Sequence, residues 1–314
     1  MKSMQYKNVA AELAALDAKI NAFLPSRYEH CYTSVPSSSM GSAGLKYGPD
    51  GRVAWDEIWT TYCDLALAGG PPHRGELLEP VSLAEVEAEP DRYESVVAEI
   101  ARAVKLTTGK LVVSGYMPGW VGIQCESMEE AAWLQFAVTA ENVSARRRRS
   151  VLQLPVGPGF RVEKEIKNVV VALAKASHYW DGHLTAAQQS LAGESVWEAA
   201  TPSETAETPS EYEAAVSEVE NCVRAAGLPT SPRQYVGWVA VEMGSEEDAV
   251  WLLRAILVER VLARREGKIL YLPICATSSA DQAARVGWAF GRASDLWKAS
   301  SPRRPAWRSS GSAK

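Results

Sequence analysis

Residues 119–155 read GWVGIQCESMEEAAWLQFAVTAENVSARRRRSVLQLP, and residues 237–273 read GWVAVEMGSEEDAVWLLRAILVERVLARREGKILYLP. The two stretches align without a gap at a spacing of 118 residues, and 17 of their 37 positions are identical. Unrelated segments of ordinary composition share about one residue in fifteen or twenty. The sequence therefore predicts an internal tandem duplication, in which one structural unit occurs twice.

The similarity continues outside these stretches with single-residue shifts. Tyr93 aligns with Tyr212, and Trp180 aligns with Trp297. We expect the two units to pack with approximate twofold symmetry. In chain order, the predicted segments are an N-terminal extension of helices and Ser/Gly/Pro loops at 1–92, the first unit at 93–183, a linker at 184–211, the second unit at 212–299 and a disordered basic tail at 300–314.

Each unit is predicted to contain α, β, β, α, β and α elements in that order, which is a mixed α/β (α+β) fold. A strand, a helix of about 20 residues and another strand predict a right-handed crossover in a mixed sheet. The extension is predicted to hold helices at 8–23 and 54–68. Apolar spacing and turn residues place the elements of the first unit as follows: a helix around 97–104, strands at 110–116 and 120–125, a helix from 127 that ends in the arginine run 146–149, a strand at 151–156 and a helix at 162–180.

Composition limits the classes of function. Hydrophobic residues make up 46% of the chain and charged residues 23%, which is ordinary for a globular protein. The formal net charge of −5 gives no general basic field for nucleic acid, and no apolar run is long enough to span a membrane. The 5 cysteines lack CxxC spacing, which argues against a zinc ribbon or a disulfide framework. We expect a soluble, cytoplasmic protein with reduced thiols, for which a homo-oligomer is one of the allowed states.

The linker and the tail are predicted to be mobile. Residues 184–210 are rich in Ala, Ser, Thr, Glu and Pro and show little apolar periodicity. From Lys298 to the end, the chain has basic residues but no acidic ones. Neither segment offers enough periodic apolar surface to offset the entropy lost on ordering it.

The string CDLALAGGPPHRG at residues 63–75 is the most unusual in the chain. A helix that carries Cys63 is predicted to stop at the glycine pair, and two prolines stiffen the loop that displays His73 and Arg74. His73 is a candidate acid/base, Arg74 a candidate anion clamp and Cys63 a neighbouring catalytic residue. The alternative is a helix stop followed by an ordinary surface turn.

Two further loops are candidate ligand-binding elements. One contains Ser38 and Ser39 and follows His30, and its small residues would let backbone N–H groups approach an anion. The other contains Gly157 and Gly159 between a predicted strand and the next helix, a place where anions bind in many proteins. For both, an ordinary surface loop is the alternative.

All 4 histidines precede the linker, which favours a site in the first half. His178 is a further ligand-binding candidate, and we expect His73 and Arg74 to lie near it or near residues 155–160. His178 and His183 are five residues apart, which places them on different faces of a helix. Because HxH and HxxxH patterns are also absent, no metal site is predicted.

Glu141 and Glu259 occupy matching positions on helix faces that also carry Trp133 and Trp251. A carboxylate on such a face is predicted to be partly buried and to have a basic partner, from the arginines that follow or from a lysine of the last helix of the unit. A structural ion pair at each of these two glutamates is favoured over a catalytic role, because the second unit keeps the glutamate and has no histidine.

These patterns favour a cytoplasmic enzyme that acts on a small anionic metabolite at a site in the first half. The rival class is a ligand-binding or assembly protein without chemistry, whose Trp-rich faces bury a partner. The sequence identifies no cofactor, no reaction type and no particular substrate.

Overall fold

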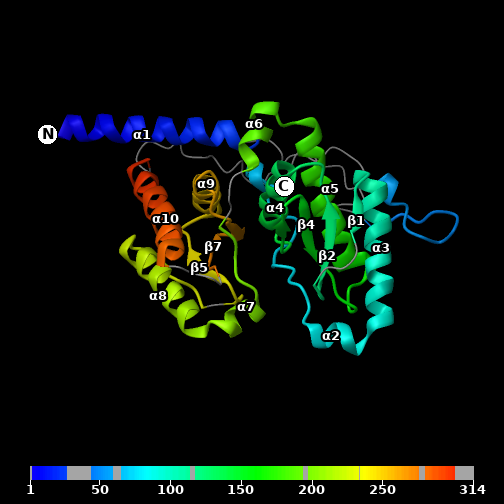
Figure 1. Ribbon diagram of the computed structural model, residues 1–314. Coiled ribbons are helices and arrows are strands. Elements are labelled where there is room, and N and C mark those ends of the chain that lie inside the picture. The colour runs from blue at the N-terminus through cyan, green and yellow to red at the C-terminus, as the bar shows by residue number, and fades with distance from the viewer. Residues whose placement is uncertain are drawn as a thin grey trace, which may run out of the picture.

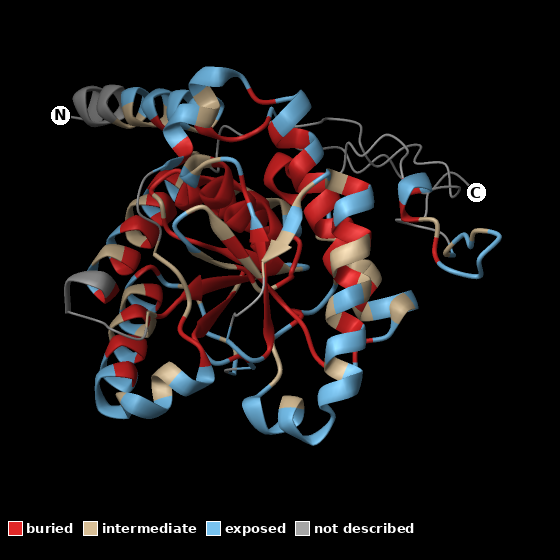
Figure 2. Cartoon of the chain, turned by 45° about the vertical axis from the view of Figure 1, so that its right-hand side comes forward, coloured by how far each residue is buried: buried red, intermediate tan, exposed pale blue. Residues whose placement is uncertain are grey.

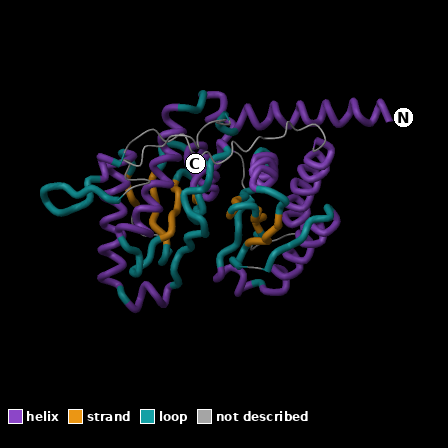
Figure 3. Tube along the Cα trace, turned by 180° about the vertical axis from the view of Figure 1, so that it is seen from behind, coloured by secondary structure: helices purple, strands orange, loops and turns teal. Residues whose placement is uncertain are grey.

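The computed structural model describes residues 2–26, 44–58, 65–113, 117–193, 197–232, 234–275 and 280–300. These residues form a mixed α/β protein with two antiparallel sheets, so the predicted class is confirmed. Figures 1 and 3 show the two sheets side by side, each with its own set of helices. The long helix α1 runs along one end of the molecule and extends beyond it (Figure 1).

The first sheet has the strand order β1-β2-β4-β3, and every neighbouring pair is antiparallel. Helix α5 packs against both α3 and α4. In chain order, the elements of this half are α2 (Leu83–Ala88), α3 (Pro90–Thr108), β1 (Leu111–Val113), β2 (Trp120–Gln124), α4 (Met128–Ala140), β3 (Arg146–Arg148), β4 (Val151–Pro155), the π-helix η3 (Val162–Ile166) and α5 (Lys167–Gly182).

The second sheet has the order β5-β7-β6 and is also antiparallel. Its register corresponds to that of the first sheet, since Trp120 lies opposite Pro155 and Trp238 lies opposite Pro273. An isolated bridge at Thr230 takes the position beside β5 that β1 has beside β2. The elements of this half are α7 (Pro202–Glu207), α8 (Pro209–Ala225), β5 (Trp238–Glu242), α9 (Glu246–Leu257), β6 (Arg264–Glu266), β7 (Ile269–Pro273) and α10 (Ala280–Ser300).

The N-terminal segment contributes α1 (Lys2–Phe23) and two short 3-10 helices, η1 (Trp55–Glu57) and η2 (Ala66–Ala68). The predicted continuous helix at 54–68 is wrong, because Ile58 and Leu65 lie outside any helix. Trp55 is fully buried against α3, where its indole N–H donates to Glu99 over 2.7 Å.

The arginine run does not end a helix, which corrects the prediction. Helix α4 stops before it, and Arg146–Arg148 form strand β3. Asn142, with φ 61°, turns the chain out of the helix, and Arg149, with φ 55°, lies in the tight turn between β3 and β4. Arg260 and Gly267 have φ 64° and 54° at the matching positions of the second half. The left-handed backbone at these four positions lets the chain reverse in few residues.

The extra strand changes the topology of the sheet. The prediction joined β2 to β4 by a crossover in a mixed sheet, but these strands are antiparallel. Because β3 is antiparallel to β4, strands β2 and β3 run in the same direction. Helix α4 therefore connects two strands of the same direction that lie on either side of β4.

The predicted linker contains regular structure. Helices α6 (Ala186–Ser190), η4 (Leu191–Gly193) and α7 lie within it. Thr185 starts α6 with a capping box, in which its side chain and that of Gln188 each bond the backbone of the other. Residues of the predicted tail beyond Ser300 lie outside the described residues.

Part of this segment corresponds to residues that precede α3 in the first half. Trp197 forms a parallel bridge with Val261, and Leu78 forms the matching bridge with Val143. Helices α2 and α7 are both six residues long, and each begins with a capping box. These matching features precede residues 93 and 212, at which the two units are predicted to begin.

Helix α4 lies at the centre of the core. Every residue from Glu130 to Ala140 is buried, and the helix contacts α5, β3, β4, η2 and η4. Figure 2 shows buried residues concentrated in the strands and on the inner faces of the helices. The ring of Trp133, which is fully buried, lies 6.1 Å from that of Trp180.

Trp133→Ala should lower the free energy of unfolding by about 3–5 kcal/mol, because it empties a buried aromatic site. The matched control is Trp288→Ala, which removes an indole that is 46% exposed. That change should cost about 0.5 kcal/mol. Urea denaturation measures both, and equal losses would contradict a core centred on α4.

Candidate functional site

The buried carboxylate of Glu141 organises the loop that carries His73. Glu141 is the C-cap of α4 and is fully shielded from water. One of its oxygens accepts the backbone N–H of Ala66 over 2.8 Å, and the other accepts the backbone N–H of His73 over 2.6 Å. The ammonium group of Lys175 on α5 lies 3.2 Å from the second oxygen. The loop is therefore folded around a buried ion pair.

The matching carboxylate of the second half, Glu259, is also held by a cation of the last helix. Arg292 on α10 lies 3.2 Å from one oxygen, and Lys19 of α1 lies 2.9 Å from the same atom. Lys175 and Arg292 are 117 residues apart, so they occupy matching positions. In each half, the end of the central helix is thus fixed to the last helix by an ion pair.

The loop before α2 also bonds to the second half. Arg265 of β6 donates to the carbonyl of Gly70 over 3.0 Å, and Arg254 of α9 donates to another carbonyl of this loop. The Asn142 side chain donates to the carbonyls of Arg74 and Arg265 over 2.8 and 2.9 Å. We call this set of contacts the clamp, because it ties the loop to both halves.

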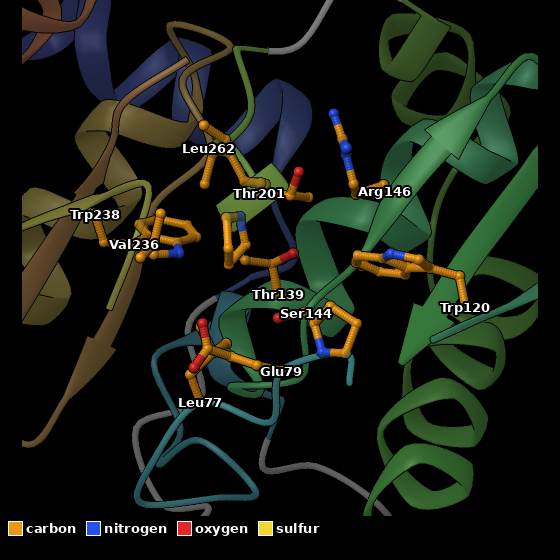
Figure 4. A pocket seen from close by; sticks show the side chains of 15 residues that line it. Leu77, Glu79, Trp120, Thr139, Ser144, Arg146, Thr201, Val236, Trp238 and Leu262 are labelled. Carbon is orange, nitrogen blue, oxygen red and sulfur yellow. The ribbon is translucent and has the colours of Figure 1, made fainter. Parts of the chain in front are cut away.

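A pocket lies where the two halves meet, and we call it the junction pocket. Its empty space is about 440 Å³, a volume that includes solvent at the open side of the pocket. Trp120 of β2 and Trp238 of β5 lie on opposite sides of it, with Thr139 between them (Figure 4). Both indoles are almost fully buried. The walls are therefore largely apolar, with few polar groups.

Thr139 supplies an unusual polar group to this pocket. It lies in the last turn of α4 and is 1% exposed. Its hydroxyl has no hydrogen-bond partner among the described residues. A helical threonine usually donates to the carbonyl four residues earlier, as Thr107 does to Ala103 over 2.8 Å. A buried hydroxyl without a partner costs about 1–3 kcal/mol, so a partner from outside the chain would be strongly favoured.

Arg146, at another edge of the pocket, is already paired within the protein. It lies 3.2 Å from Glu198 and 2.9 Å from Glu204. Burial acts to lower the pKa of Arg146, but these two carboxylates raise it. The charge of Arg146 is thus neutralised without a ligand.

Arg264 occupies the matching position in the second half and is enclosed by aromatic rings. Its guanidinium lies 3.9 Å from the ring centre of Tyr271, 4.5 Å from that of Tyr235 and 5.0 Å from that of Trp238. Burial lowers the pKa of Arg264, and the carboxylate of Glu266 at 2.6 Å opposes this. Burial, with the same carboxylate, raises the pKa of Tyr235 to about 12. The guanidinium of Arg264 and the two tyrosine rings thus pack against Trp238, which forms one wall of the junction pocket.

None of the predicted site residues that the structure describes lines the junction pocket. His73 and Arg74 lie at the clamp and do not line the junction pocket. Gly157 is buried, and a side chain there would approach Val81 to 2.4 Å, so this glycine permits close packing. Gly159 is exposed. The remaining candidates, His30, Ser38, Ser39 and Cys63, lie outside the described residues.

The placement of His178 corrects another prediction. The spacing of five residues placed His178 and His183 on different helix faces, but their Nε2 atoms lie 3.1 Å apart. Helix α5 ends at Gly182, and His183 follows with φ −125°. Because the chain leaves the helix there, the periodicity that separates the two faces no longer applies. Partial desolvation by the surrounding side chains and the charge of the neighbouring His183 lower the pKa of His178, although its side chain remains exposed.

Sequence reasoning missed the junction pocket. Its signal was the identity of matched residues, Trp120 with Trp238 and Arg146 with Arg264. These tryptophans align in the repeat, but nothing in the sequence showed that they face one space. Thr139 gave no signal, because threonine on a buried helix is usually satisfied by its own backbone.

No family model and no curated protein matches the chain. Among solved structures, serine palmitoyltransferases show weak similarity. One from S. paucimobilis with a bound PLP–myriocin aldimine has 14% identity and a TM-score of 0.26, with 47% of this chain and 36% of that chain covered. Another, with a PLP internal aldimine, has 16% identity and a TM-score of 0.27, with 48% and 37% covered. The match spans less than half the length of those enzymes, and similarity at this level does not indicate a shared activity.

Two features are absent from the ranges that the structure describes. None of their helices combines the length and the apolar character that crossing a bilayer requires. Within the same ranges, no group of three or more His, Cys, Asp or Glu side chains is arranged to hold one metal ion. The fold and the pocket thus define a two-sheet α/β protein with a mainly apolar pocket between its halves.

Lys175→Met should lower the free energy of unfolding by about 3–5 kcal/mol, because the carboxylate of Glu141 would stay buried without its cation. Adding Glu141→Gln should recover part of this loss, since the amide carries no charge. Urea denaturation of the two single variants and the double variant gives the coupling energy. A neutral effect of Lys175→Met would contradict the role given to this ion pair.

Proposed function

We propose that this protein binds a small molecule in the junction pocket. The observation that carries the proposal is the buried hydroxyl of Thr139 between two indoles, which has no hydrogen-bond partner in the described part of the chain. Ligand sites combine mostly apolar walls with a few polar groups, and their volumes are about 300–1,000 Å³. The junction pocket has this kind of lining, but its cavity volume of about 40 Å³ is well below that range, so its walls would have to move apart to admit a ligand.

The chemistry of the walls favours a compact ligand with an apolar or aromatic body and one hydrogen-bonding group. Trp120 and Trp238 would cover the body, and the hydroxyl of Thr139 would donate to, or accept from, the polar group. Arg146 does not favour an anion, because it already pairs with Glu198 and Glu204. Glu79 lies at the pocket edge. Burial raises the pKa of its carboxyl group, and the positive charge of Arg264 acts in the opposite direction.

The enzyme hypothesis with His73, Arg74 and Cys63, and with a small anionic substrate, stays a prediction. The clamp offers another explanation for the stiff Gly-Gly-Pro-Pro loop. Its backbone N–H and carbonyl groups bond to Glu141, Asn142 and the second half, so rigidity has a structural use. The binding class of function therefore has the stronger support.

We also propose that the two halves arose by duplication and are related by an approximate twofold axis. Support comes from the corresponding strand orders, from the matching registers of β2 with β4 and of β5 with β7, and from the paired capping boxes of α2 and α7. The junction pocket would then lie near the axis, which explains why matched tryptophans form its opposite sides.

Thr139→Val tests the proposed site, because it replaces the hydroxyl with a methyl group of similar size. In the ligand-free protein it should raise the free energy of unfolding by about 1 kcal/mol, since an unpaired buried hydroxyl is removed. The matched control is Thr107→Val on α3, which should lower this free energy by about 1 kcal/mol because a bonded hydroxyl is lost.

Binding is measured by native mass spectrometry of the purified protein and by thermal shift with a fragment set of aromatic amides and alcohols. Hits should stabilise the wild type and Thr107→Val, and the shift should be lost or greatly reduced in Thr139→Val. Hits that stabilise all three proteins equally would show that the fragments bind elsewhere. If His73→Ala abolished binding while Thr139→Val did not, the site would lie at the clamp instead.

A further inference from the structure

The two histidines at the end of α5 form a convergent pair of nitrogen atoms. The Nε2 atoms of His178 and His183 lie 3.1 Å apart, and their ring centres lie 4.9 Å apart at an interplanar angle of 71°. Both residues are exposed, so the pair is open to solvent. The ring of Tyr179 lies 4.9 Å from that of His183 and holds it from one side. The pair is thus positioned by neighbouring structure.

This distance is compatible with a metal ion shared by the two rings. Imidazole nitrogens bind zinc at about 2.0–2.1 Å, and two ligands of a square-planar or tetrahedral ion subtend angles of about 90–109°. Two such nitrogens therefore lie about 2.9–3.4 Å apart. The separation of His178 and His183 falls within that interval.

We propose that His178 and His183 form a binding site for a divalent transition metal ion of the zinc or copper type. Both rings would carry their proton on Nδ1 and present the lone pair of Nε2 to the ion. Water completes the coordination, because no third His, Cys, Asp or Glu in the described ranges joins the pair to form a larger group. The site is independent of the junction pocket.

A hydrogen bond between the two rings also fits 3.1 Å, and it makes a different prediction. In that case one Nε2 carries a proton and the other accepts it, so the two rings are not equivalent. A metal ion would make both Nε2 atoms unprotonated ligands. The two arrangements are therefore distinguishable from the nitrogen signals of the rings.

The experiment titrates the full chain, labelled with 15N-histidine, with Zn²⁺ and follows the ring nitrogens in two-bond 1H–15N correlation spectra. Isothermal titration calorimetry gives the affinity. The variants are His178→Asn and His183→Asn, which change exposed side chains, and the matched control is His73→Asn, which removes a histidine at the clamp. Circular dichroism checks that each variant is folded.

We expect Zn²⁺ to shift the Nε2 signals of His178 and His183 together in the wild type and in His73→Asn. Either variant of the pair should lower the Zn²⁺ affinity at least about tenfold, because one of two protein ligands is lost. A shift of only one of these rings, a signal confined to other histidines, or unchanged affinity in His178→Asn would each overturn the proposal.

Discussion

The ion pair between Glu141 and Lys175 is the constraint on which the rest of the structure depends. The two side chains are 0% and 1% exposed, and taking charges out of water costs several kcal/mol per ion. That cost is offset only when the hydrogen bonds of the pair are complete. The backbone N–H groups of Ala66 and His73 complete them at the carboxylate. The central helix, the last helix of the first half and the loop before α2 must therefore take their positions together.

The residue after Glu141 carries this constraint to the junction. Asn142 has a left-handed backbone, so the chain turns out of α4 at the point where the two halves meet. Its side chain accepts a hydrogen bond from Arg264 over 3.1 Å and donates to two backbone carbonyls, one of them in the second half. Thr139 lies just before Asn142, in the last turn of α4. The pocket wall and the contact between the halves are thus set by one helix end.

Much of the fold could be predicted from the sequence, because the repeated pattern fixes strands and helices locally. Strands β2 and β4 and the central helix followed from Trp120, Ser127 and the apolar runs. Strand β3 was missed because four arginines in succession resemble a helix end, and their pairing with β4 depends on the turn at Arg149. The candidate sites were harder to predict from the sequence. His178 and His183 meet only because α5 ends between them, and the junction pocket depends on how the two halves pack, which local patterns do not encode.

The differences between the two halves carry more functional information than their identities. Trp120 and Trp238 are identical and present similar walls, so a pocket built only from matched residues would offer a ligand two equivalent orientations. Thr139 and Ser144 differ from the matching residues of the second half, which are Leu257 and Leu262. A hydroxyl on one side would select one orientation and would add the free energy of a hydrogen bond made where water is excluded, about 1 kcal/mol or more. In the proposed site, specific binding would therefore depend on these departures from symmetry.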